Sequence, residues 1–178
     1  MNYPELEAIF NSHGFPDFRW IRASDIVLAQ WVRMKCIYGC GSYGKKGSCP
    51  PNTPSLDECR EFFSDYESAV VFHIAARLDI PGDRHRFSRQ INTRLLEVER
   101  EVFLKDFRKA FLLFMDECQL CSACPGTIDD CVNHKMMRPC PESMGVDVFA
   151  TVRKYDLPIK VLKDYDDEMN RYAFLLID

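Results

Sequence analysis

The sequence lacks the segments and motifs that identify several large classes of protein. It has no apolar run near the roughly 20 residues that a membrane-spanning helix requires, and no polybasic tail. A glycine-rich nucleotide-binding loop and a serine nucleophile elbow are both missing. The sequence therefore offers no support for a membrane protein, for nucleotide-dependent chemistry or for serine hydrolysis.

Charge and composition indicate the partner, the compartment and the number of domains to expect. The formal net charge of −4 argues against nucleic acid as the main partner, because phosphate binding needs a basic face. Residues 1–10 lack the positive region and the long apolar stretch of a signal peptide, so we expect a cytoplasmic protein. With 47% hydrophobic and 28% charged residues in a chain of 178, we expect a single globular domain over residues 1–178.

Cysteine is the residue that stands out, with nine in the chain. In a reducing compartment cysteines remain thiols, so a clustered set favours metal binding or catalysis over disulfide bonds. The odd number also means that complete disulfide pairing would leave one cysteine over. The cysteines concentrate in two segments, residues 35–54 and 117–141, which are rich in turn-forming residues. A long irregular loop is uncommon in a compact domain unless something holds it, and a metal would hold it.

Hydrophobic periodicity predicts helices separated by strands. The expected helices cover residues 4–13, 24–34, 55–66, 86–105 and 146–155, and Ser55 with Glu58 has the spacing of a capping box. The expected strands cover residues 18–21, 69–74, 110–115, 159–162 and 172–177. This order predicts an α/β domain with a mixed sheet of about five strands, flanking helices and cysteine-rich loops at one edge.

The second cysteine group carries the more specific spacing. Cys118, Cys121 and Cys124 form a C-x2-C-x2-C run, which places three thiolates around one short turn, as a [4Fe-4S] cluster requires. The fourth ligand is either Cys131 or Cys140. The C-x3-C-P continuation of bacterial ferredoxins is absent. Four thiolates also satisfy tetrahedral zinc, but zinc sites usually come as two separated C-x2-C pairs, so the triplet favours an iron–sulfur cluster.

The first cysteine group lies among glycines and comprises Cys36, Cys40 and Cys49. Glycines let backbone amides approach the sulfur atoms, and such hydrogen bonds tune a cluster. Lys45 and Lys46 are either counter-charges for thiolates or solvated loop lysines. Three ligands leave one metal position open, as a catalytic site does, unless Cys140 completes this group and eight cysteines serve two clusters.

These motifs resemble a family of uncharacterised prokaryotic proteins described as predicted metal-binding proteins. The resemblance rests on the run from Cys36 to Pro54, with its Cys49-Pro50-Pro51, and on the run from Cys118 through Cys131 to Arg138-Pro139 and residues 145–148. It spans nearly the whole chain and implies metal binding, without naming a substrate. The resemblance favours Cys131 over Cys140 as a ligand, because the family often carries serine at the position of Cys140.

Other candidate residues have simpler interpretations. Cys59 lies in phase with the apolar residues of its helix and is expected to be buried. His73, in an apolar run, is expected to be a hydrogen-bonded core histidine, whereas His134 lies between cysteines and is a candidate ligand or acid–base group. His13 and His85 are expected at the surface. Four arginines form either a solvated helix face or a docking site for an anion or an acidic redox partner: Arg84, Arg86, Arg89 and Arg94.

Two functions fit these observations. The first is a redox or electron-transfer protein with one or two iron–sulfur clusters and a redox partner protein. The second is a zinc-binding structural or metal-handling protein without catalysis. A thiol oxidoreductase has little support, because no C-x-x-C follows a thioredoxin-like βαβ pattern. The sequence leaves open whether the protein is an enzyme, what its substrate is and whether it forms oligomers.

Overall fold

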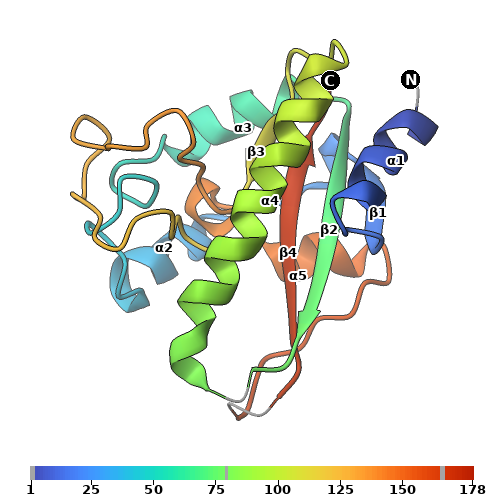
Figure 1. Ribbon diagram of the computed structural model, residues 1–178. Helices are drawn as coiled ribbons and strands as arrows, with labels where there is room; N and C mark the ends of the chain where they lie inside the picture. The colour runs from blue at the N-terminus through green and yellow to red at the C-terminus, as the bar shows by residue number, and fades with distance from the viewer. Residues whose placement is uncertain (1–2, 79, 165–166) are drawn as a thin grey trace.

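The computed structural model describes residues 3–78, 80–164 and 167–178 (Figure 1). This part of the chain contains four strands, five α-helices and three short 3-10 turns. None of the helices described there combines the length and the apolar character that a membrane span needs. The elements are α1 (Tyr3–Ser12), β1 (Phe18–Arg22), η1 (Ala23–Asp25), α2 (Gln30–Gly39), α3 (Leu56–Ser64), β2 (Ser68–Ala76), η2 (Pro81–Asp83), α4 (Arg84–Leu104), β3 (Phe111–Leu113), η3 (Glu142–Met144), α5 (Val148–Arg153) and β4 (Met169–Leu176).

The strands form one antiparallel sheet in the order β1-β2-β4-β3. The α/β class is confirmed, but the predictions of a mixed sheet and of five strands are wrong. Residues 159–162 form no strand. Ile159 packs against the core instead, and the Tyr172 hydroxyl donates a hydrogen bond to the Pro158 carbonyl.

Helices cover both faces of the sheet. Apolar residues of α1 and α4 pack on one face against alternate residues of β2, such as Val70 and Phe72. On the other face, α3 and α5 pack against the intervening residues, including Val71 of β2 and Phe174 of β4. Because both faces are buried, β2 is a nearly continuous apolar run rather than an alternating one. The predicted capping box at Ser55 and Glu58 is present and starts α3.

The helix expected at residues 24–34 begins later. Ser24 and Asp25 belong to η1, Leu28 pairs with Val146 in an isolated bridge, and α2 starts only at Gln30. The β-branched and apolar residues 26–28 favour this extended pairing over helix. The helix also ends later than predicted. It extends to Gly39, so that Cys36 lies on α2 and not in the predicted loop.

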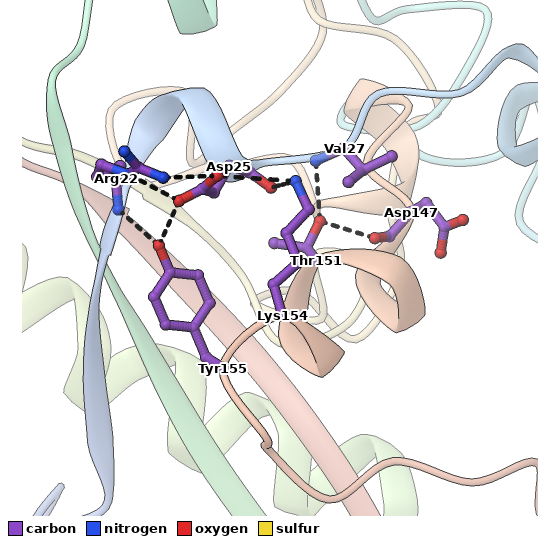
Figure 2. Close-up of polar contacts among 7 residues, drawn as sticks. All are labelled: Arg22, Asp25, Val27, Asp147, Thr151, Lys154 and Tyr155. Atoms are coloured by element: carbon purple, nitrogen blue, oxygen red, sulfur yellow. Dashed lines mark hydrogen bonds and ion pairs between the residues drawn. The ribbon is translucent and has the colours of Figure 1, made fainter.

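Polar contacts attach α5 to the connection between β1 and α2 (Figure 2). The Tyr155 hydroxyl donates to Asp25 at 2.7 Å and accepts from the Arg22 backbone N–H at 3.0 Å. The Thr151 hydroxyl accepts from the Val27 N–H at 3.0 Å and donates to the Asp147 carbonyl at 2.8 Å. This network fixes the chain that leads into α2, and α2 carries the first cysteines.

The pKa of Asp25 is lowered by hydrogen bonds, first from Tyr155 and then from Arg22. A lowered carboxyl pKa stabilises the fold above the usual value of 3.8, and this contribution disappears as the pH falls through the folded pKa. We therefore expect Tyr155→Phe to cost about 1 kcal/mol at neutral pH, and to cost less below about pH 4. Urea unfolding at a series of pH values measures the difference.

The control for this prediction is Tyr66→Phe, which removes a hydrogen bond to the Lys109 carbonyl, a group that does not titrate. Its cost should not change over the acidic range. An equal and constant cost for both variants would contradict the role assigned to Asp25.

Candidate metal centres

The first set of cysteines surrounds a cavity of about 360 Å³. Cys36 comes from α2, Cys40 follows the end of that helix, and Cys49 lies in the loop beyond. Cys140, just before η3, lines the same cavity. The structure thus places Cys140 with the first group rather than with the C-x2-C-x2-C run.

Hydrogen bonds to backbone carbonyls hold the elements around this cavity. The Arg33 guanidinium on α2 donates to the Ser143 carbonyl at 2.6 Å and to the Pro54 carbonyl at 3.0 Å. The Cys36 thiol lies 3.9 Å from the carbonyl oxygen of Glu142. Through these contacts α2, the segment before α3 and the η3 turn keep fixed positions, so cysteines distant in the sequence face one another.

The second set consists of Cys118, Cys121, Cys124 and Cys131, which enclose a much smaller space of about 10 Å³. The segment leaves the edge strand β3 and has no helix or strand of its own before η3. Side chains hold it in place of regular structure. Arg89 of α4 donates to the Gln119 carbonyl at 2.6 Å and to the Cys121 carbonyl at 3.3 Å.

One sulfur atom of this second set already receives a hydrogen bond from a side chain. The Asn133 amide lies 2.9 Å from the Cys121 sulfur and donates to it. Burial raises the pKa of the Cys118 thiol, and a hydrogen bond from the Leu120 backbone N–H to its sulfur offsets part of that rise. Donors of this kind stabilise thiolate charge, and they orient metal ligands in known sites.

The two cysteine-rich segments lie against each other, beside α2 and α4 (Figure 1). Asn52 links them, because its amide donates to the Lys46 carbonyl at 3.1 Å and to the Gly126 carbonyl at 2.8 Å. A Cβ atom on Gly47 would lie 2.6 Å from the Thr127 carbonyl oxygen, so only glycine allows this approach. Gly47 and Ser48 of the first segment form part of the wall around the second set.

Burial keeps several of these thiols protonated. It raises the pKa of Cys49 to about 12, with further contributions from Glu117 and the neighbouring thiols. It also raises the pKa of Cys36 and Cys118, and places the pKa of Cys140 well above its usual value. A neutral thiol is a poor metal ligand, so binding a cation here must displace protons.

Acidic groups also surround the first cavity. Glu142 lines the cavity, and burial raises the pKa of Asp116, which pairs with Arg171. Glu117 accepts hydrogen bonds from Ser42 and Gln119. Of the two loop lysines, Lys46 offsets a small part of the rise in the pKa of the Cys49 thiol, and Lys45 is exposed. The cavity therefore favours a cation over an anion.

The remaining candidates lie elsewhere. Cys59 is fully buried in the core, as predicted, and its thiol lies 3.7 Å from the Pro54 carbonyl oxygen. His73 forms hydrogen bonds with Asp17 and Asn170. His134 is exposed and lines neither cysteine set.

Three of the four arginines on α4, Arg86, Arg89 and Arg94, are exposed, as expected for a solvated helix face, and all four also contact neighbouring groups. Arg94 donates to the His13 carbonyl, Arg86 pairs with Asp83, and Arg84 contacts the Met169 sulfur. Arg89 holds the C-x2-C-x2-C turn, as described above. Their periodic spacing gave no indication of these structural contacts.

Within the described ranges, no group of three or more histidine, cysteine, aspartate or glutamate side chains forms a site for one metal ion. Tetrahedral zinc with bonds of about 2.3 Å would require thiolates about 3.8 Å apart. An iron–sulfur cluster places its own iron and sulfide atoms between the thiolates, so its ligands stand farther apart.

Several residues around the sites were not identified from the sequence. Ser48, Asn52 and Asn133 each neighbour a cysteine within three positions, and that proximity was the one available signal. Arg33 and Arg89 lie on helices and reach the site through long side chains, which spacing alone does not reveal.

A comparison with models of protein families gives one match, over residues 19–177. That family is described as "Predicted metal-binding protein (DUF2284)". It is the family that the cysteine motifs resemble. No curated protein and no solved structure matches the chain.

Because the buried thiols must lose protons to bind a metal, affinity should depend on pH. We expect the metal-free protein to bind Zn²⁺ more tightly as the pH rises from about 6 to about 8. The association constant should increase up to tenfold per pH unit for each proton that binding releases. Competition with a chelator measures the affinity, and a pH indicator measures the protons. Cys59→Ala, the control, should leave the pH dependence unchanged. Binding that does not vary with pH would contradict thiol ligation.

Proposed function

The chain belongs to this family, and we propose that eight of its nine cysteines hold two metal centres. The observation that carries the proposal is the convergence of thiols from distant segments into two adjoining sets of four. The proposed ligands are Cys36, Cys40, Cys49 and Cys140 for the first centre, and Cys118, Cys121, Cys124 and Cys131 for the second.

Iron–sulfur clusters suit these residues for two reasons. All eight donors are sulfur atoms, which thiolate-ligated clusters require. The first cavity, at about 360 Å³, has room for a cluster and for a small molecule beside it. A bound cluster would supply one-electron transfer, and the protein would then exchange electrons with a redox partner.

The two sets would serve this role differently. Cys40 is exposed and Trp31, at the same cavity, is 48% exposed, so the first set is accessible from outside. The second set lines a smaller space with Gly47, Ser48, Pro125, Asn133 and Met137, and its four cysteines are all half-buried. A partner protein or a substrate would therefore reach the first centre more readily, through Cys40.

A second candidate function is favoured by the size of the second space. About 10 Å³ is close to the room for a single water-sized sphere. A structural zinc ion bound by four cysteines needs little more, whereas a cluster would require these cysteine side chains to turn outward. The segment between β3 and η3 has no helix or strand to resist that movement. This candidate makes the second centre a clamp without a redox role.

Optical spectra separate the two candidates. Protein purified without oxygen should be brown, with a broad visible absorption that bleaches when a chemical reductant is added, because iron–sulfur clusters absorb through their thiolate and sulfide ligands. Elemental analysis of the same sample should find iron and acid-labile sulfide. A colourless protein with stoichiometric zinc would reject the iron–sulfur proposal.

Cysteine variants test the assignment of ligands. Cys121→Ala should lose the second centre and keep the first, as measured by metal content per chain. Cys59→Ala is the matched control, because its thiol is fully buried in the core and outside both sets. It should keep both centres and lose only stability. Equal metal loss in the two variants would contradict the assignment.

A further inference from the structure

Ser48 is a buried polar residue whose hydroxyl lacks a hydrogen-bond partner. Its side chain is 3% exposed, and the hydroxyl oxygen is one of two buried side-chain atoms without a partner in the described part of the chain. Buried hydroxyls are nearly always paired, because leaving one unpaired loses its hydrogen bonds to water without replacement. The position of Ser48 therefore needs an explanation.

The surroundings of Ser48 are the cysteines of the second set. It lines the same small space as Cys118, Cys121, Cys124 and Cys131, although it belongs to the loop of the first set. The close approach of Gly47 to Thr127 and the two hydrogen bonds from Asn52 fix the loop in this place. Its neighbour Cys49 lines the other cavity, so adjacent residues serve the two sets.

We propose that the Ser48 hydroxyl is a hydrogen-bond donor to the sulfur atoms of the second centre, and that it sets the affinity of that centre for metal. The inference rests on the proposed function. The acceptor is a thiolate or, in a cluster, an inorganic sulfide, both of which are negatively charged sulfur. Asn133 and the Leu120 N–H give Cys121 and Cys118 such bonds from within their own segment, and Ser48 would supply a donor from the other segment.

The proposal predicts opposite effects of one substitution in two states of the protein. In the metal-loaded chain, Ser48→Ala removes a hydrogen-bond donor to charged sulfur. Of the metals bound by the two centres, that of the second centre should therefore bind about tenfold more weakly. In the metal-free chain, the same substitution removes an unpaired buried hydroxyl, so the thermal midpoint should stay the same or rise. Chelator competition with Zn²⁺-loaded protein and thermal unfolding of metal-free protein provide the two measurements.

Ser122→Ala is the matched control, since Ser122 is an exposed serine between Cys121 and Cys124. It should change neither the affinity nor the thermal midpoint. If the protein carries iron–sulfur clusters, Ser48→Ala should also make the reduction potential of one cluster more negative, because donors to sulfur stabilise the reduced state.

The possible failures can be told apart. Two classes of bound metal with unchanged affinity in Ser48→Ala would overturn the role of Ser48 and leave the proposed function standing. A lower thermal midpoint in the metal-free variant would show that the hydroxyl has a structural partner, and would also overturn the inference. A wild-type chain that binds no metal would reject both the proposed function and the inference.

Discussion

A thiol that is buried beside other thiols is stable either as the neutral acid or as a thiolate that shares its charge with a metal. The structure gathers eight cysteines in two adjoining sets, and this constraint is strongest at the buried Cys49 and Cys140. Burial raises the pKa of Cys36, Cys49, Cys118 and Cys140, so without a cation these groups stay protonated at neutral pH. The acidic residues around the first cavity act in the same direction. A metal removes this conflict, since it replaces the protons and binds the sulfur atoms together.

The α/β frame supplies the positions from which the cysteines converge. The first set depends on α2, whose start is fixed by the contacts of α5 with the chain after β1 (Figure 2). The second set begins where β3 ends, and Arg89 of α4 holds its first turn. Arg138, past the last cysteine of that set, pairs with the buried Glu99 of the same helix at 2.8 Å. Long side chains on regular elements thus anchor segments that have little regular structure of their own.

Much of the frame followed from local signals. The capping box at Ser55, the long amphipathic α4 and the apolar strand β2 were predictable because periodicity and capping act over a few residues. The start of α2 was not, because residues 26–28 extend to pair with Val146, a contact that spans more than a hundred positions. The strand expected at residues 159–162 is absent for a similar reason, because this segment packs against the core through Ile159, a tertiary contact that its β-prone composition does not reveal.

The grouping of the cysteines could also be predicted only where it depends on neighbours in the sequence. Spacing grouped Cys118, Cys121 and Cys124 correctly in space, because a short turn keeps them together whatever the fold. Cys140 was ambiguous, since its assignment depends on where the chain returns after Cys131. The path places it at the first cavity. Proximity to Cys49 was the one signal at Ser48, and it did not indicate that Ser48 lines the space of the second set, because that placement arises from the contact of one loop with the other.

The central claim is that cysteine sulfur from both sets binds an inorganic centre. X-ray absorption at the iron edge, with the zinc edge as a reference, tests it most directly on protein purified without oxygen. The account predicts a first shell of sulfur alone, and a second shell of iron scatterers at the short separation of a cluster. A first shell of nitrogen and oxygen ligands, or the absence of both edges from a fully folded protein, would contradict it.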